Sequence, residues 1–226
     1  MSLAQKVFVC LCIRHNRFRY SAFGREANRT IKELIVPAPS EFPSWSIASA
    51  ATSVLAAPNN AGTPTPSLGQ LGWKLFQLQE FFDIRKGKRL TKSRMVPGQT
   101  PFIGAIARNN GISCFVGQAA IHEGNTITVN YNGSVGEAFY QPRPFWCSDD
   151  VNVLYPRFKL TPRIALFITT VIRRERYRYN FGRKWDLDRM RPSTVRLPVD
   201  SAGQPDWPLM EQYISSLPFS SQIETV

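Results

Sequence analysis

Residues 173 to 185 read RRERYRYNFGRKW, a basic and aromatic stretch around which the rest of the chain is organised. Five arginines alternate with four aromatic residues: Arg173, Arg174, Arg176, Arg178 and Arg183 with Tyr177, Tyr179, Phe181 and Trp185. A guanidinium group can lie flat on an aromatic ring while its N–H groups bind a phosphate, so the stretch indicates contact with nucleic acid. For the aromatic rings we expect packing beneath arginine stems, with stacking on unpaired bases as the alternative.

The same stretch occurs a second time near the N-terminus. From residue 8 the chain reads FVCLCIRHNRFRYSAFGRE. When one residue near Ala22 is skipped, Arg14, Arg17, Arg19, Tyr20, Phe23, Gly24 and Arg25 repeat Arg173, Arg176, Arg178, Tyr179, Phe181, Gly182 and Arg183. The second copy is therefore closely related to the first.

The segments around the two stretches follow one order. An apolar run precedes each of them, and the pairs 34–37 with 195–198 and 43–45 with 205–207 follow. Matching order over about forty residues indicates a duplicated structural unit. We expect residues 1–46 to be the C-terminal remnant of a first domain, 47–70 a Pro/Ala/Ser-rich linker with a short helix over 47–57, and 71–226 a complete domain.

The composition favours a globular chain with a polyanionic partner. Of 226 residues, 43% are hydrophobic, and 28 Lys plus Arg against 16 Asp plus Glu give a formal net charge of +12. Such a balance concerns association more than fold, and a merely soluble basic protein is the alternative. No apolar run reaches the roughly 20 residues that span a bilayer, so we expect a cytoplasmic protein without a membrane segment.

The four cysteines do not form a metal-binding pattern. They stand at 10, 12, 114 and 147 without C-x-x-C spacing. Cys10 and Cys12 lie in an apolar run and Cys114 precedes Phe115, which predicts buried, reduced thiols. We therefore expect no zinc site and no cofactor.

Strands dominate the first half of the complete domain. We expect a short strand and turn from Trp73, then strands at 101–107, 112–116 and 126–130, another that starts at Phe139 and Tyr140, and one at 151–155. Strand 126–130 is expected to be half buried, and 112–116 to pair back on 101–107. Asn109-Asn110-Gly111 is typical of a turn with positive backbone dihedrals. Residues 132–136, with two glycines three apart, predict a tight hairpin, with a phosphate site as the alternative.

Helices follow the strands. Thr161-Pro162 predicts the start of a helix that runs to about Arg176. Its core-facing apolar stripe consists of Ile164, Phe167, Ile168, Val171 and Ile172. A second helix begins after Asp206, faces inward through Trp207, Met210, Tyr213, Ile214 and Leu217, and is ended by Pro218. This order predicts an α+β domain with a mixed, mainly antiparallel sheet and packed helices.

Two basic segments and several loops are the candidate DNA-binding sites. The first segment is a loop around Gly87 with Arg85, Lys86, Lys88, Arg89, Lys92 and Arg94, and the second contains Arg173, Arg174, Arg176, Arg178, Arg183 and Lys184. The candidates for base contacts are Asn109, Asn110, Gln141, Arg143 and Asn180. Arginine clusters give sequence-independent, salt-dependent binding, whereas base contacts supply specificity.

Catalytic patterns are absent from the sequence. Asn130-Tyr131-Asn132-Gly133 lacks the proline of a methyltransferase box, and Asp149-Asp150 has no Glu-x-Lys partner downstream. Neither His15 nor His122 belongs to a triad-like motif. The sequence therefore indicates binding without catalysis, and no metal.

With these residues in view, the chain resembles the target-recognition domains of restriction-modification specificity subunits of the type I and BcgI-like families. Five segments carry the resemblance across residues 73–218: WKLFQLQEFFDIRKGKRLTK, TPFIGAIARNNGI, ITVNYNGSVGEAFYQ, ALFITTVIRRERYRYNFGRKW and VRLPVDSAGQPDWPLMEQYI. The resemblance implies that the protein binds double-stranded DNA, that each recognition domain reads one half of a split target, and that separate subunits methylate or cut.

The leading hypothesis is therefore a non-catalytic DNA specificity subunit that positions methyltransferase and restriction subunits, with a homodimer as an open arrangement. The alternatives are a truncated inactive copy, an assembly scaffold whose helices 162–176 and 207–217 contact other subunits, and a small nuclease. Because the motif at 173–185 is shared by units that would read different half-sites, we expect base contacts between residues 85 and 145.

Overall fold

The computed structural model describes residues 5–6, 8–10, 38–42, 65–180, 182–217, 220 and 223. The chain divides into two compact units, Met1–Pro58 and Asn59–Val226. The point of division lies inside the linker expected over 47–70, of which 47–64 are outside the described residues.

The first unit contains a short helical turn. In η3 (Pro39–Glu41), Glu41 Oε2 accepts a hydrogen bond of 2.8 Å from the Ala38 amide. The Phe42 side chain is buried and meets the Phe8 ring edge-on, with 5.2 Å between centroids. The first copy of the repeated stretch, residues 14–25, and the helix expected over 47–57 lie outside the described residues.

The second unit alternates short strands with helices. Its strands are β1 (Trp73–Gln77), β2 (Phe82–Lys86), β3 (Thr100–Ile103), β4 (Ile112–Val116), β5 (Thr126–Asn130), β6 (Ala138–Gln141), β7 (Trp146–Cys147), β8 (Val151–Pro156) and β9 (Thr194–Pro198). Its α-helices are α5 (Leu78–Phe81), α6 (Pro162–Arg174), α7 (Leu187–Met190) and α8 (Trp207–Ser216). Its 3-10 helices are η4 (Leu68–Gln70), η5 (Lys92–Arg94), η6 (Asn109–Gly111) and η7 (Glu175–Arg178).

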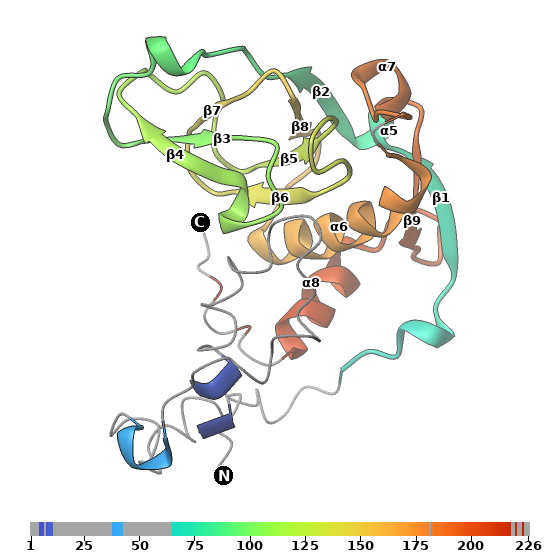
Figure 1. The fold of residues 1–226 in the computed structure, drawn as a ribbon. Coiled ribbons are helices and arrows are strands. Elements are labelled where there is room, and N and C mark those ends of the chain that lie inside the picture. Colours follow the sequence, from blue (N-terminus) through green and yellow to red (C-terminus); the bar gives the residue numbers. More distant parts are fainter. Residues whose placement is uncertain are drawn as a thin grey trace. The chain divides into compact units, whose positions relative to one another are not determined.

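The strands form three sheets. A four-stranded sheet has the order β2-β8-β5-β6, a three-stranded sheet the order β4-β3-β7, and β1 pairs with β9. Every pairing is antiparallel except that of β3 with β7. In Figure 1, α6 lies on one side of β5 and β6 in the four-stranded sheet, and the three-stranded sheet of β3, β4 and β7 lies on the other side. The expected α+β class with a mainly antiparallel sheet and packed helices is confirmed.

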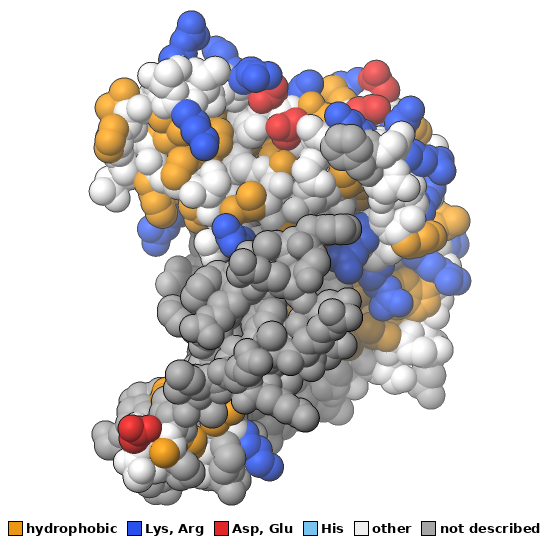
Figure 2. Space-filling model, viewed as in Figure 1, with side chains coloured by type: hydrophobic (Ala, Val, Ile, Leu, Met, Phe, Trp, Pro, Cys, Tyr) orange, Lys and Arg blue, Asp and Glu red, His pale blue; other side chains and the backbone are white. Residues whose placement is uncertain are grey.

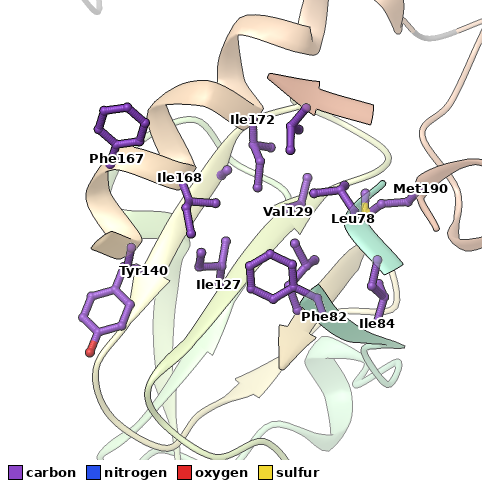
Figure 3. Packing of buried hydrophobic residues seen from close by; sticks show 14 of the residues in the cluster. Leu78, Phe82, Ile84, Ile127, Val129, Tyr140, Phe167, Ile168, Ile172 and Met190 are labelled. Carbon is purple, nitrogen blue, oxygen red and sulfur yellow. The ribbon is translucent and has the colours of Figure 1, made fainter. Parts of the chain in front are cut away.

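One face of the four-stranded sheet is apolar and carries the helices. Ile127 and Val129 of β5 point toward Ile168 and Ile172 of α6, and all four side chains are almost fully buried (Figure 3). Side chains two apart on a strand and four apart on a helix share a face, so these two periodicities meet here. This contact forms the main core of the domain, which Leu78 and Met190 extend toward β1 and α7.

Helix α6 begins and ends close to the predicted residues. Thr161 caps it by accepting the Ile164 amide at 3.2 Å, and Pro162 occupies the first turn. The α-helix stops at Arg174, and η7 continues the chain to Arg178. The buried stripe is confirmed, although Val171 is only partly buried.

Helix α8 packs against α6. Asp206 caps it by accepting the Leu209 amide at 2.9 Å, and the helix ends at Ser216, while Pro218 is outside the described residues. The Trp207 ring stacks on Phe158 at 4.1 Å between centroids. Of the expected inward residues only Met210 is fully buried; the other four are half-buried.

The opposite face of the sheet combines a second apolar cluster, in which Val151 and Val153 of β8 pack with Ile103, Phe145 and Cys147, with a polar network. Gln141 Nε2 donates to Thr128 Oγ1 at 3.1 Å and to the Asn110 carbonyl at 3.0 Å. Asn110 Nδ2 returns a bond to the Tyr140 carbonyl at 2.8 Å, and Asn130 Nδ2 donates to Ile106 O at 3.1 Å. Buried polar groups need such partners, so this network fixes loop 104–111 over the sheet.

Several strand predictions needed correction. Strand β3 ends at Ile103 where an extension to residue 107 was expected, because the chain turns over the sheet from Gly104. Strand β5 is buried along its whole length and not half-buried, since the sheet has a layer on each face. Strands β7 and β9 were not expected. The pairing of β4 back on β3 is confirmed, with Thr100 opposite Val116.

The cysteine prediction is wrong for two positions. Cys10 and Cys114 are exposed, the latter because the middle residues of β4 face solvent at the sheet edge, and Cys12 lies outside the described residues. Cys147 is buried, and desolvation raises the pKa of its thiol well above the usual range.

Candidate nucleic-acid interface

Parts of the two basic segments meet at one end of the four-stranded sheet. Strand β2 finishes at Lys86 opposite Asn152, and β5 finishes at Asn130 opposite Val151. The end of α6 and the η7 turn that follows it reach the same place, because Arg173 of α6 pairs with Glu137 in the β5–β6 connection and Gly136 there lies against Arg176 of η7. We call this end, where β2 and β5 finish and β6 and β8 begin, the basic end of the sheet.

Arg85 and Lys86 are held on a strand and not on a loop, which corrects the prediction. The Arg85 guanidinium lies 4.2 Å from the centre of the Tyr155 ring and pairs with Asp83 at 2.7 Å. The Lys86 ammonium lies 5.1 Å from the centre of the Tyr131 ring. Hydrogen bonding raises the pKa of both groups, chiefly from Asp83 for Arg85 and from Tyr131 for Lys86, so both stay charged.

The loop that follows is anchored by its backbone. Lys88 accepts a bond from Trp146 Nε1 and donates its own amide to Cys147 O, both at 3.0 Å, so its side chain projects from a fixed point. Arg89 is 3.9 Å from Asp149, with 78% of its side chain exposed. Such an exposed pair contributes little to stability and leaves the guanidinium accessible.

Lys92 and Arg94 lie at a different place. Both belong to η5, and Gln118 Nε2, beyond the end of β4, donates to the Arg94 carbonyl at 2.5 Å. Both side chains are exposed, and neither makes an ion pair within the described residues. The basic segment 85–94 therefore divides between the basic end of the sheet and the far end of β4.

Four of the loop candidates, Asn109, Asn110, Gln141 and Arg143, do not lie with the arginines. Asn109, Asn110 and Gly111 have φ values of 51°, 52° and 78°, which confirms the predicted turn. The Asn110 side chain donates to the Tyr140 carbonyl, and the buried Gln141 side chain donates to the Asn110 carbonyl. Gln141 is therefore not available to a base, whereas Asn110 is exposed with its Nδ2 engaged. Asn109 and Arg143 are exposed, with no side-chain partner in the described part of the chain.

The arginines at the end of α6 are partly neutralised. Glu137 pairs with Arg176 at 2.9 Å and with Arg173 at 3.4 Å, and the Arg173 guanidinium also lies 4.7 Å from the centre of the Phe139 ring. Arg178 pairs with Glu175 at 3.0 Å, which raises its pKa. Sequence reasoning missed Glu137, because it lies 36 residues before Arg173 and only the fold brings them together.

Arg174 keeps its charge available. Its side chain is exposed on the last turn of α6, and it makes no ion pair within the described residues. A cation in the last turn is also favoured by the helix dipole. Arg174 is therefore an accessible cation of the second segment.

The aromatic rings of the repeated stretch have different environments. Tyr179 and Trp185 stack at 4.3 Å between centroids, and both are buried in the main core. Packing, the expected role, is confirmed for Tyr179 but is wrong for Tyr177, whose surface is 81% exposed. Phe181 lies outside the described residues.

Beyond Tyr179 a tight turn presents Arg183 and Lys184. Asn180 and Arg183 exchange two backbone hydrogen bonds of 3.1 Å, and Asn180 Oδ1 also accepts the Arg183 amide at 2.9 Å. The oxygen of the Asn180 side chain is thus engaged in the turn, which argues against a base contact. Arg183 is exposed, and Lys184 is half-buried beside it.

The surface charge is positive but interrupted. Figure 2 shows Lys and Arg side chains over the part that carries β3 and β4 and over the part that carries β1 and α7, with carboxylates between them. Asp149 and Asp150 are among the carboxylates near the basic end, and Asp150 Oδ1 accepts Asn132 Nδ2 at 2.8 Å. The two aspartates are thus engaged in a turn.

No catalytic or metal-binding cluster stands out. In the described part of the chain, no group of three or more His, Cys, Asp or Glu side chains is placed to hold a metal ion. His122 is buried, and its Nδ1 lies 2.7 Å from the Tyr155 hydroxyl. Its pKa is lowered mainly by burial and to a lesser extent by the charge of Arg85. Among the described residues, no helix has both the length and the apolar character needed to cross a bilayer.

This fold, with its sheet, packed helices and basic end, is the class formed by DNA specificity domains of restriction-modification systems. Residues 70–225 match the family described as "Type I restriction modification DNA specificity domain", and the chain belongs to this family. The family and the α+β fold suggested by the sequence resemblance are thereby confirmed.

Individual relatives agree with this assignment. The chain is 36% identical over 211 residues to the "Type II restriction enzyme BgcI specificity subunit S.BcgI" of Heyndrickxia coagulans, covering 87% of this chain and 61% of that protein. A "Putative type I specificity subunit S.MpnORF201P" of Mycoplasma pneumoniae is 32% identical over 84 residues, or 36% of this chain and 35% of that protein. The chain thus spans less than two thirds of the length of either relative.

A solved structure shares the fold. The S subunit of a type I restriction-modification system from M. genitalium superposes with a TM-score of 0.52 at 17% identity. The match covers 93% of this chain and 48% of that one. At this identity the likeness concerns the fold alone.

Proposed function

We propose that this protein binds double-stranded DNA sequence-specifically as the specificity subunit of a restriction-modification system. The observation that carries the proposal is the convergence of cations from both basic segments on one end of the four-stranded sheet. Lys86, Lys88 and Arg89 arrive there from β2, and Arg174 arrives from α6. Membership of the DNA specificity family supports the same role.

In this proposal the cations position the duplex and the loops read it. Lys86, Lys88, Arg89, Arg174 and Arg183 contact phosphates, which carry no sequence information. Asn109 and Arg143, which project from loops near the far end of β6, are the candidates for base contacts because their polar groups are exposed. Loops held by a rigid sheet suit this task, since they can vary without changing the fold.

We assign no catalysis to this chain and propose that methyltransferase and nuclease subunits act on the DNA it selects, in the cytoplasm. The first unit is proposed to be part of a first recognition domain. In support, the similarity to S.BcgI covers 87% of the chain, more than residues 70–225, and so includes residues outside the matched family domain. Each recognition domain, or each chain of a homodimer, then reads one half of a split target.

Selection from a random duplex library tests the proposal. The expected result is a short consensus in the selected duplexes, bound with an affinity that falls steeply with salt. Salt-dependent binding without any enrichment would contradict specificity, and absence of binding would point to an assembly scaffold or an inactive copy. Cleavage of the duplexes by the isolated chain with Mg²⁺ would contradict the non-catalytic assignment.

A further inference from the structure

A surface hollow lies beside the repeated stretch and is lined by arginines from three places in the chain. Its volume is about 290 Å³, and its lining residues are Arg178, Tyr179, Arg183, Arg189, Pro192 and Ser193. Arg178 ends η7, Arg183 follows the turn at Asn180, and Arg189 belongs to α7. Arg189 was not a candidate from the sequence.

The floor of this hollow is rigid. Ser193 Oγ lies 2.8 Å from the Tyr179 hydroxyl, accepts Trp185 Nε1 at 2.9 Å and donates to the Arg189 carbonyl at 2.5 Å. The stacked Tyr179 and Trp185 rings are buried. The three guanidinium groups are therefore presented from a fixed base, which limits the entropy lost when an anion binds.

The chemistry of the hollow suits a phosphate. Arg178 pairs with Glu175 and Arg189 with Asp186 at 3.7 Å, whereas Arg183 has no carboxylate partner within the described residues. Each guanidinium carries five donors, so a group already paired retains donors for a second oxyanion. A water occupies about 30 Å³ of liquid, so the hollow has room for a tetrahedral phosphate and part of its sugar.

The sequence repeat indicates that the ligand is a phosphate of the DNA backbone. Arg178, Tyr179 and Arg183 correspond to Arg19, Tyr20 and Arg25 of the first copy. Units that read different half-sites share only the sugar-phosphate backbone as a DNA contact. The three lining residues that occur in both copies therefore suit a sequence-independent contact, and the surplus of positive charge favours DNA over a protein partner.

We propose that Arg178, Arg183 and Arg189 form a docking site for one backbone phosphate of the duplex. The site rests on the proposed DNA-binding function and adds to it a sequence-independent anchor. A contact of this kind fixes where the domain sits on the duplex, and the loops then reach the bases at a set distance from that phosphate.

Substitution of the unpaired arginine tests the site in DNA binding. Arg183→Gln is expected to reduce affinity for the selected and for a scrambled duplex by the same factor, roughly eightfold at 0.1 M salt, and to lower the salt slope by about 0.9. The matched control is Arg196→Gln, an exposed arginine on β9 without a side-chain partner in the described residues, which leaves both quantities unchanged. An unchanged slope in Arg183→Gln overturns the site, as does a loss confined to the selected duplex.

A titration with inorganic phosphate separates this site from the proposed function. In the ¹⁵N-labelled full chain, the side-chain Nε–H signals of Arg178, Arg183 and Arg189 are expected to shift together, and those of Arg196 to stay. Such shifts, without any duplex binding by the wild type, would support the phosphate site and contradict the proposed function. Duplex binding by the wild type, without shifts and with an unaltered Arg183→Gln, overturns the hollow while the function stands. Loss of assembly with a co-expressed methyltransferase subunit, with duplex affinity intact, also overturns it in favour of a protein contact.

Discussion

The two basic segments differ in how they are built into the domain. Residues 88–94 form a loop whose lysines and arginines are exposed and mostly without carboxylate partners among the described residues. Residues 173–185 have Tyr179 and Trp185 in the main core, and Arg173, Arg176 and Arg178 pair with glutamates. A high density of arginines therefore marks a folding element in one segment and an accessible cationic loop in the other.

Because of this difference, the number of basic residues in a segment does not equal the number of cations that are free to contact a ligand. Glu137 neutralises part of the second segment, so the number of arginines overstates its attraction for DNA. The first segment has fewer aromatic residues but presents more unpaired cations. Variants that remove a core ring, a core hydrogen bond or a neutralising carboxylate test whether residues 173–185 act mainly in folding and residues 88–94 mainly as accessible cations.

The largest effect is expected from Trp185→Ala. Trp185 is fully buried and stacked on Tyr179, so its loss leaves a cavity that lowers the free energy of unfolding by about 3–5 kcal/mol. Tyr177→Ala, which removes an aromatic residue that is 81% exposed in the same segment, is the control and changes stability by less than about 0.5 kcal/mol. Urea denaturation measures both. Equal effects would show that the stretch is a surface patch throughout.

A smaller loss is expected from Ser193→Ala. The substitution removes the oxygen that accepts Trp185 Nε1 and contacts the Tyr179 hydroxyl, and leaves two buried donors without a partner. The cost is about 1–3 kcal/mol in the same denaturation experiment. Ser201→Ala, in an exposed turn, serves as the control. A Ser193→Ala protein as stable as the wild type would argue against this network.

Glu137→Gln should change DNA binding more than stability. The unfolding free energy falls by roughly 1 kcal/mol or less, because Arg176 is 63% exposed and Arg173 39% exposed. Both guanidiniums become available to phosphates, so duplex affinity rises and the salt slope steepens by about 1–2. Asp188→Asn, the same charge change at a side chain 94% exposed, is the control for net charge. Equal slopes in the two variants would mean that Arg173 and Arg176 do not reach DNA.

The smallest expected effect is a pH dependence of the unfolding free energy that arises from His122, next to Arg85. Burial and the charge of Arg85 hold the pKa of His122 below its usual 6.5, so the folded state keeps the ring neutral. This stability is complete above about pH 6.5 and is lost as the pH falls through the lowered folded value, because the unfolded chain takes up a proton first. Denaturation of the wild type and of His122→Gln from about pH 7.5 to 5 measures it. The same slope in both would assign the dependence to other groups.

The sequence predicted the features that depend on local chemistry. Thr161-Pro162 gave the start of α6, Asn109-Asn110-Gly111 gave a turn with positive φ, and residues 112–116 gave β4. The hairpin at 132–136 followed from its glycines. At Gly133 and Gly136 an added Cβ would come within 2.7 Å of the Ala105 carbonyl and 2.6 Å of Arg176 Cβ, so these residues are needed for packing within the domain.

Features that depend on distant residues were not predictable. The pairing of β1 with β9 joins residues more than 115 positions apart, and the two-residue β7 is too short to show periodicity. In the candidate interface, the arginines were found by composition, but their partner Glu137 and the Asn110–Gln141 exchange arise only when strands meet. A side chain that suits a base contact equally suits a buried network, and burial decides between them.

The pairing of β1 with β9 determines where the layered part of the domain connects to the rest of the chain. Trp73 lies opposite Pro198, so the chain enters and leaves the layered part of the domain through neighbouring antiparallel strands. A gene segment encoding it can be copied in tandem or exchanged with little demand on the connecting polypeptide, since the ends of the insert are already together. The antiparallel pair thus brings the two ends of this layered part next to each other, so a longer or shorter insert between them would place little strain on the flanking chain.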